Sequence, residues 1–380
     1  MSKEKKKKKF PWRALIIIPL FLGASFALGW FFGKKLTPIL KELPPEKIVL
    51  TLIVFYVCLF LFPLLQTAAH EAGHLICGLL SGYQYSSFRI GSFMWVKLDG
   101  KIRFKRYSLA GTGGQCLMAP PDKVEGKFPY ALYLSGGCLA NAIVSVIPLV
   151  LVLIFWKLSF FNCMVVFWAL FGLIDVLTNG IPMKLQGLPN DAHNVMSLGK
   201  NPESLNAFWL QMKINEQIAL GKRIKDLPEE WFLMPDEEGM QNPLSATIAV
   251  FACNRLVDAG KYEDAAKEME RVLNEKNAII GIHKHMLNVD RIYCEMVGEN
   301  RPEKLEELYT DELKKMMQVM KKSPSVYRTQ YIYAKYVQMN EKMAKAAMEQ
   351  FEKVAKTYPY PHEIAGERDM IAYAENKLAN

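Results

Sequence analysis

The sequence predicts an α-helical membrane protein with four transmembrane helices, a small β-ribbon insertion and a C-terminal all-α domain. Long apolar runs recur between residues 14 and 177. A stretch over residues 83–122 has the alternation and turn signals of β-strands. Residues 201–380 are rich in Lys, Glu, Met and Ala and show amphipathic helical periodicity. We therefore expect a membrane-embedded domain over residues 1–200 and a cytoplasmic helical domain over residues 201–380.

The composition agrees with a membrane protein and argues against a nucleic-acid-binding one. Hydrophobic residues make up 51% of the chain and charged residues 22%. The net charge of +9 comes partly from a lysine cluster at the N-terminus, which lies just before an apolar run. There it is typical of a topology signal that contacts anionic lipid of the bilayer, so we expect no nucleic acid partner. The seven cysteines show no CxxC spacing, and we interpret them as small core residues.

Four apolar segments are long enough to cross a bilayer, at about residues 14–32, 48–69, 130–156 and 160–177. The first is longer than the apolar part of a signal peptide and lacks a cleavage site, so we expect an uncleaved anchor. The lysines in front of it place the N-terminus in the cytoplasm. Four crossings then place both termini of this cell-membrane protein in the cytoplasm, together with the basic segment between the second and third spans.

That basic segment is predicted to form the β-ribbon. Phe88–Ile90 and Phe93–Leu98 have strand patterns, Asp99 and Gly100 form a hairpin turn signal, and Lys101–Tyr107 is the return strand. After it, we expect irregular structure because five residues there break regular elements. They are Gly111, Gly113, Gly114, Pro120 and Pro121. The ribbon is expected at or near the cytoplasmic face of the membrane.

The second apolar run contains an HExxH motif formed by His70, Glu71 and His74. On a helix, residues four apart share one face, so both imidazoles can reach one zinc ion at ~2.0–2.1 Å. Glu71 is the expected catalytic base, which activates a zinc-bound water. Chance would produce the motif in under ~1% of chains of this composition. Ionisable residues in a membrane helix are also costly and functional by default.

A catalytic zinc needs a third protein ligand, and three residues near the fourth apolar run are candidates. We expect Asp191 first, His193 second and Asp175 third. Asp175 has an alternative role in a helix–helix hydrogen bond. Two histidines with a carboxylate suit zinc well, although the sequence does not distinguish zinc from another divalent metal.

Several of these features together resemble the site-2 protease family of intramembrane metalloproteases. They are HEAGH late in an apolar helix, a glycine-rich β-segment, the small-residue stretch from Ser135 to Asn141, and Asn179-x-x-Pro182 followed by Asp191. The resemblance covers roughly residues 48–200. It implies that Asp191 completes the zinc site and that regulated intramembrane proteolysis is the activity. The chain departs from the family in Cys138, where Pro is common, in Ala192, where Gly is usual, and in the long gap from Asn179 to Asp191.

Asn141 is a candidate for contact with the substrate. Its amide can donate a hydrogen bond to the substrate backbone or to the developing oxyanion. The alternative is an amide that packs two helices together.

The C-terminal half contains one segment that resembles a tetratricopeptide-type helical repeat. Gly260, Tyr262 and Ala265 match its Gly-x-Tyr-x-x-Ala core, and a weaker echo begins at Tyr333. The length allows roughly five units of ~34 residues. Such repeats present a concave surface for peptides or proteins, whereas a plain helical bundle is the alternative.

From these observations we expect a zinc-dependent endopeptidase that cleaves membrane-anchored or membrane-associated proteins or peptides. The C-terminal domain would bind the substrate or a regulatory protein. The alternative is a non-catalytic membrane adaptor that binds partners through this domain. A metal-ion transporter is disfavoured, because His70, His74 and Asp191 all map to the cytoplasmic half.

Overall fold

The structure is a computed structural model, and it describes residues 23, 26, 29, 30, 33–108, 112–185 and 188–379. The first predicted span, residues 14–32, lies largely outside these residues, and so does the N-terminal lysine cluster. The described chain is mostly helical and divides into two compact units. One unit joins Met1–Leu65 to Ala142–Ile174, and the other joins Gln66–Asn141 to Asp175–Asn380.

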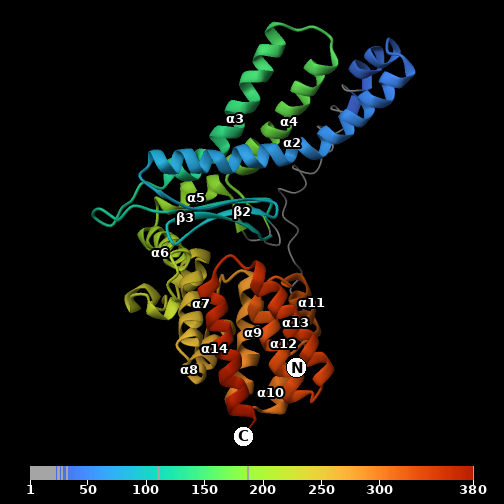
Figure 1. Cartoon of the computed structure of the whole chain (residues 1–380). Coiled ribbons are helices and arrows are strands. Elements are labelled where there is room, and N and C mark those ends of the chain that lie inside the picture. The colour runs from blue at the N-terminus through green and yellow to red at the C-terminus, as the bar shows by residue number, and fades with distance from the viewer. Residues whose placement is uncertain are drawn as a thin grey trace, which may run out of the picture. The chain divides into compact units, whose positions relative to one another are not determined.

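Among the described residues, three helices are long and apolar enough to cross a membrane, and Figure 1 labels them α2, α3 and α4. They are α2 (Pro45–Leu80), α3 (Ala131–Ile154) and α4 (Phe160–Gly180), and they overlap the second, third and fourth predicted spans, although α2 extends well beyond residue 69. Pro63 lies inside α2 and does not end it. The helix therefore continues for 36 residues, more than the ~20 residues needed for one crossing, and its last third carries the HExxH motif.

The first unit has an aromatic core and an apolar exterior. Phe55 stacks on Phe167 with ring centroids 5.4 Å apart, and Cys163 is fully buried. Trp168 donates from Nε1 to the carbonyl of Val144 at 2.7 Å. Outside this core, apolar side chains of the unit are exposed, as on a lipid-facing surface; examples are Val49, Leu50, Phe60, Leu151 and Phe161.

The second unit contains a four-stranded antiparallel sheet that confirms the predicted ribbon. Its strands are β1 (Gln84–Ile90), β2 (Phe93–Leu98), β3 (Lys101–Arg106) and β4 (Gly114–Ala119), in the order β3-β2-β1-β4. Asp99 and Gly100 form the predicted β2–β3 turn with positive φ angles of 49° and 75°.

The prediction of irregular structure after β3 is wrong for Gly114–Ala119. This segment pairs with the whole length of β1, with one irregularity between Tyr85 and Ser87. Its glycine and cysteine are poor strand signals, so the strand depends on its partner rather than on its own propensity. As a result, β4 is an edge strand that is paired on one side only.

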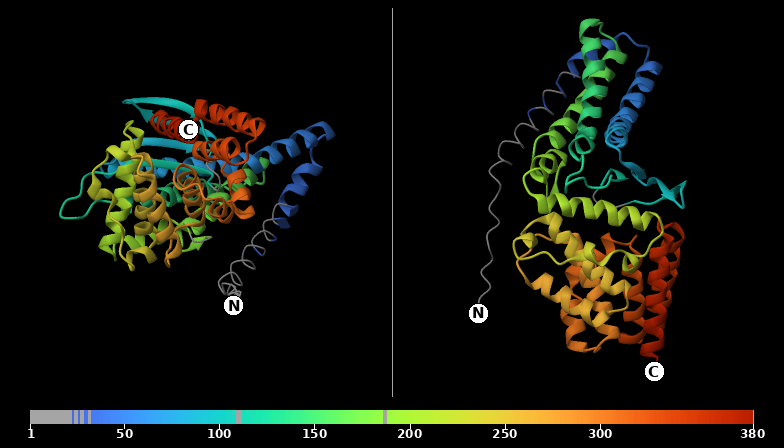
Figure 2. Two further views of the ribbon diagram at one scale, coloured as in Figure 1. Left: turned by 90° about the horizontal axis from the view of Figure 1, so that it is seen from below. Right: turned by 90° about the vertical axis from the view of Figure 1, so that its left-hand side faces the viewer.

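The rest of the second unit is mostly helical. Two short strands, β5 (Lys184–Leu185) and β6 (Leu188–Pro189), precede α5 (Asp191–Leu198) and α6 (Pro202–Ala219). The helices that follow pack side by side, as Figures 1 and 2 show from three directions. They are α7 (Pro243–Asp258), α8 (Tyr262–Asn274), α9 (Gly281–Val297), α10 (Pro302–Leu308), α11 (Asp311–Val319), α12 (Pro324–Ile332), α13 (Glu341–Thr357) and α14 (Pro361–Leu378).

The repeat-like segment forms the α7–α8 hairpin. Gly260 takes a positive φ of 74° in the turn, as the repeat pattern needs. Ala265 is fully buried, and the Tyr262 ring lies against Tyr293 with centroids 5.3 Å apart. Small and aromatic residues thus hold successive helices close together in this domain.

Candidate metal centre

The last third of α2 directs two histidines toward a carboxylate that is distant in sequence. The Nε2 atoms of His70 and His74 lie 3.1 Å apart. Oδ2 of Asp191 lies 3.1 Å from the first and 3.4 Å from the second. Within the described residues this is the one group of three potential metal ligands found. The structure thus brings together the two motif histidines and the first of the three predicted third ligands.

The outer nitrogen of each imidazole has a hydrogen-bond partner that fixes its tautomer. His70 Nδ1 lies 2.7 Å from Oδ1 of Asn141, whose Nδ2 donates to the backbone carbonyl of Gln66 at 3.0 Å. Because that carbonyl only accepts, the Asn141 oxygen must face His70, and His70 Nδ1 carries the proton. His74 Nδ1 likewise donates to the carbonyl of Tyr133 at 2.8 Å. The two inner Nε2 atoms are therefore lone-pair acceptors.

Three acceptors thus converge without a donor between them. Oδ2 of Asp191 is buried and has no hydrogen-bond partner among the described residues. Two ligands at ~2.0–2.1 Å from a tetrahedral zinc are about 3.3 Å apart, which agrees with the 3.1–3.4 Å spacing observed. Two imidazoles and a carboxylate also suit zinc chemically. The residues present therefore fit a divalent metal.

Protonated imidazoles are the other way to satisfy this carboxylate. Burial alone would raise the pKa of Asp191, but hydrogen bonds from protonated His70 and His74 would hold its pKa well below the usual value. Both arrangements keep Asp191 ionised. This supports its role as a ligand, since a carboxylate must be deprotonated to bind a metal.

Asn190 places Asp191, although the sequence analysis did not single it out. As the N-cap of α5, its Oδ1 accepts from the backbone nitrogens of His193 at 3.0 Å and Met183 at 3.1 Å. Its Nδ2 donates to the carbonyls of Thr178 at 2.7 Å and Ile181 at 2.6 Å. These bonds tie the start of α5 to the end of α4. The available signal was an Asn directly before a helix, the residue type that N-caps prefer.

The two other candidate ligands do not join the metal group. His193 supplies its backbone nitrogen to the α5 cap. Asp175 lies on α4, where its backbone carbonyl accepts from Thr178 and Asn179. Neither side chain belongs to the group of ligand atoms that lie within 4.8 Å of one another among the described residues.

Asn141 is fully buried, and its amide is engaged by protein groups. Besides the bonds to His70 and to the Gln66 carbonyl, its Nδ2 donates to Gln66 Oε1 at 2.8 Å. In this structure Asn141 therefore orients a metal ligand. A contact between Asn141 and substrate stays a prediction.

Glycines allow α2 to lie against α3 and β4. A Cβ on Gly73 would come under 3.0 Å from the backbone of Gly136, and one on Gly137 would come equally close to the His70 ring. A Cβ on Gly114 would lie 2.6 Å from Oε1 of Glu71. The Glu71 carboxylate therefore lies directly against the first residue of β4.

A buried arginine shapes the chain that leads into β4. Arg89 on β1 is 1% exposed and donates to the carbonyl of Gly91 at 2.7 Å and to that of Gly114 at 3.3 Å. It also donates to the hydroxyl of Thr112. These bonds hold the backbone that lies beside Glu71.

Comparisons with known proteins add no family assignment. No protein-family model matches the chain, and no curated protein or solved structure matches it. The residues of the site and their geometry therefore carry the functional assignment.

Proposed function

We propose that the chain is a zinc-dependent membrane endopeptidase of the site-2 protease type, which cleaves membrane-anchored or membrane-associated proteins or peptides. One observation carries the proposal. Three acceptor atoms of His70, His74 and Asp191 converge in a partly buried site, on and beside an apolar helix, with the Glu71 carboxylate one residue away from His70.

The side chains of the site have distinct roles in this proposal. His70, His74 and Asp191 would hold a zinc ion, which supplies Lewis-acid polarisation of the scissile carbonyl and makes water a stronger nucleophile. Glu71 takes a proton from the attacking water and gives it to the leaving amine. Asn141 and the Tyr133 carbonyl keep the two imidazoles in the tautomer that points Nε2 inward.

The edge strand β4 supports a way of holding the substrate. A helical peptide bond is shielded, so the substrate must unwind locally before it is cut. An unwound segment can add to the unpaired edge of β4 through backbone hydrogen bonds. Because Gly114 of β4 touches Glu71, a segment near this end of the strand would lie close to the catalytic base.

The span predicted at residues 14–32 and the membrane topology also belong to this proposal. Together with α2, α3 and α4, residues 14–32 would give four crossings with both termini in the cytoplasm. The sheet would meet the lipid headgroups, because one face of β2 and β3 exposes Phe93, Trp95, Ile102 and Phe104. Aromatic side chains close to basic ones are typical of membrane interfaces, and Arg106 lies over the Phe93 ring.

The C-terminal helices would form a tetratricopeptide-like domain that binds the substrate or a regulator. The α7–α8 hairpin with Gly260, Tyr262 and Ala265 supports this assignment.

The test is zinc content and cleavage measured together on full-length, detergent-purified protein, with a synthetic transmembrane peptide as substrate. We expect about one zinc and cleavage for the wild type. Glu71→Gln should keep the zinc and lose cleavage, whereas Asp191→Ala should lose both. His193→Ala is the matched control and should keep both, because its side chain lies outside the metal group.

Two outcomes would contradict the proposal. A wild-type protein that binds no zinc would exclude the metalloprotease. A Glu71→Gln variant that still supports the protein's cellular role would favour the adaptor, in which the helical domain alone acts.

A further inference from the structure

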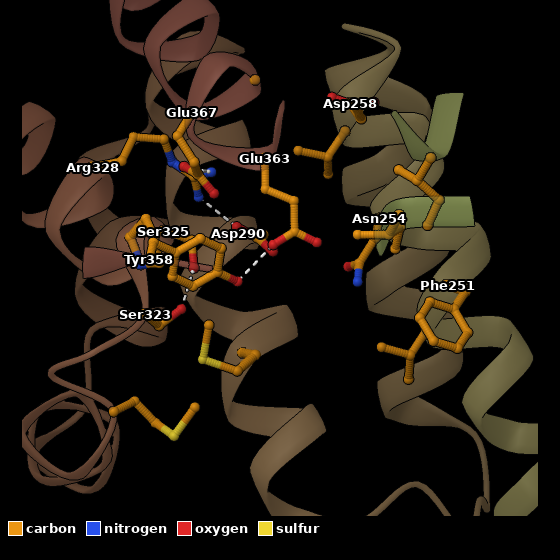
Figure 3. A pocket seen from close by; sticks show the side chains of 18 of the residues that line it. Phe251, Asn254, Asp258, Asp290, Ser323, Ser325, Arg328, Tyr358, Glu363 and Glu367 are labelled. Carbon is orange, nitrogen blue, oxygen red and sulfur yellow. Dashed lines mark hydrogen bonds and ion pairs between the residues drawn. The ribbon is translucent and has the colours of Figure 1, made fainter. Parts of the chain in front are cut away.

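The C-terminal domain contains a cavity that the metal centre does not use. Its volume is about 610 Å³, within the range of pockets that bind small molecules and short peptides. Figure 3 shows Phe251, Asn254 and Asp258 of α7 on one side and Arg328 and Glu367 on the other. The Glu363 side chain extends between the two sides.

The interior of the cavity holds more carboxylates than guanidinium groups. Arg328 is shared between Asp290 and Glu367, and Arg223 pairs with Asp258. Glu363 accepts a hydrogen bond from the Tyr358 hydroxyl at 2.6 Å, and it forms no ion pair with the described residues. The interior thus has a carboxylate without a cation.

The basic residues that remain on the lining lie at its rim. Lys222, Lys321 and Lys322 are exposed. Water and salt screen such charges, whereas charges in the half-buried interior interact more strongly. The rim therefore weakens, but does not cancel, the attraction of the interior for one cation.

Two further observations indicate that polar groups of the lining are poorly solvated. Nδ1 of His283 and Nε of Arg328 are buried without a hydrogen-bond partner among the described residues. Burial raises the pKa of Glu363, and it raises the pKa of Glu367 to about 7. Both effects show polar groups whose solvation has been lost and not fully replaced.

Only a few residues of the chain separate the lining of the cavity from the metal centre. Tyr107 and Ser108 line it, and the Tyr107 ring contacts Tyr358 with centroids 5.7 Å apart. From Ser108 the chain runs to Gly114, which touches Glu71. Six residue steps span at most roughly 20 Å, so an extended polypeptide of modest length can reach from the cavity to the catalytic base.

We propose that this cavity binds a lysine or arginine side chain in the cytoplasmic flank of the membrane-anchored substrate, with Glu363 as its main partner. The proposal rests on the proposed proteolytic function. Cytoplasmic flanks of membrane spans are enriched in lysine and arginine, so a substrate that enters from the cytoplasmic side carries the cation that the interior lacks. The rim lysines favour a single basic side chain over a polybasic run.

The proposal can be tested by binding of two fluorescent peptides to the full-length Glu71→Gln protein, which does not cleave them. Both are ten-residue, terminally blocked peptides that differ only in a central arginine or its neutral analogue citrulline. We expect the arginine peptide to bind about tenfold more tightly, as measured by fluorescence anisotropy. Equal dissociation constants would overturn the proposal, and this comparison needs no variant in the cavity.

Variants then locate the binding site. Added to the Glu71→Gln background, Glu363→Gln should abolish the preference for arginine, because the amide keeps a hydrogen-bonding group for Tyr358 but has no charge. Glu349→Gln is the matched control, on an exposed part of α13 outside the cavity. An arginine preference that survives Glu363→Gln would place the binding elsewhere and overturn the proposal.

Cleavage kinetics separate this proposal from the proposed function. In the catalytically competent protein, Glu363→Gln should raise KM about tenfold for a transmembrane substrate with an arginine in its flank, with kcat unchanged. Cleavage that is insensitive to Glu363 would refute the cavity proposal alone. If the protein binds arginine but shows no cleavage that depends on Glu71, the proposed proteolytic function is contradicted. The bound peptide would then not represent the flank of a substrate.

Discussion

Asn141 acts on the metal centre through its single hydrogen bond to His70. The substitution Asn141→Leu keeps the size but removes the hydrogen bonds that Asn141 makes with His70 Nδ1 and the Gln66 carbonyl. We expect zinc affinity to fall about 10- to 100-fold, the usual effect of losing such a supporting bond. Competition with a chromogenic chelator measures this change, and Asn206→Leu on the exposed surface of α6 is the control. Unchanged affinity would show that His70 does not need Asn141.

The residues of the site differ in how far the sequence could predict them. The spacing of His70 and His74 is local, so helical geometry alone predicts that they share a metal. Asp191 could be ranked first among only three candidates, with support from the family resemblance, because α4 and α5 bring it from far along the chain. The orientation of the Asn141 side chain and the capping role of Asn190 depend on the residues that lie next to them in space. No pattern within the sequence specifies which residues these are.

The start of β4 limits the position of the Glu71 carboxylate, the proposed catalytic base. In Gly114→Ala, the new methyl group would lie 2.6 Å from Oε1 and 2.7 Å from Cγ of Glu71, so the carboxylate must move. We expect kcat to fall about tenfold or more while bound zinc is retained, since a displaced base costs rate and not ligands. Steady-state cleavage together with zinc analysis measures both.

The neighbouring glycine supplies the control for this element. A Cβ on Gly113 would meet Thr67 at 3.8 Å, an ordinary contact. Gly113→Ala should therefore keep wild-type kcat. If kcat falls equally in both alanine variants, the cause is the reduced flexibility of the loop and not the contact with Glu71.

The same sheet shows why some elements were predictable. The β2–β3 hairpin has alternating apolar residues and an Asp-Gly turn, so local signals specify it. The strand β4 has neither, and it forms because β1 offers a complementary edge. The bounds of α3 and α4 were predicted within three residues, because length and hydropathy specify such helices, whereas α2 continues 11 residues beyond the predicted span.

The helical domain as a whole should lose stability as pH rises toward neutrality. The pKa of Glu367 is raised from 4.5 to about 7 by burial, with the charges of Asp290 and Glu363 adding to the effect. A carboxyl whose pKa is higher in the folded state contributes stability below its unfolded pKa and loses it as pH rises through the folded value. Between pH 4.5 and 7 the loss is on the order of 2 kcal/mol.

Urea unfolding of the full-length protein, followed by circular dichroism across this pH window, measures the effect. Glu367→Gln should have a flatter profile, because the neutral amide does not titrate. Glu349→Gln should follow the wild type. Parallel profiles for all three proteins would show that Glu367 does not control the pH dependence.

At the scale of the whole chain, the sequence predicted a membrane-type half and a helical half, and the structure contains both kinds of element. It did not predict the cavity. The residues Asn254, Glu363 and Arg328 lie on three different helices, and only the packing of α7, α12 and α14 brings them to one space. Amphipathic periodicity indicates which side chains are buried, but it does not specify which helices become neighbours.

The three ligand atoms also join distant parts of the chain. His70 and His74 are one helical turn apart, whereas Asp191 follows the whole of α3 and α4. A bound cation would therefore act as a reversible crosslink that closes a long loop, and loop closure of this kind lowers the entropy of the unfolded chain. Loading with metal would then strengthen the protein as well as activate it, and an unloaded copy would be the first to unfold and be degraded.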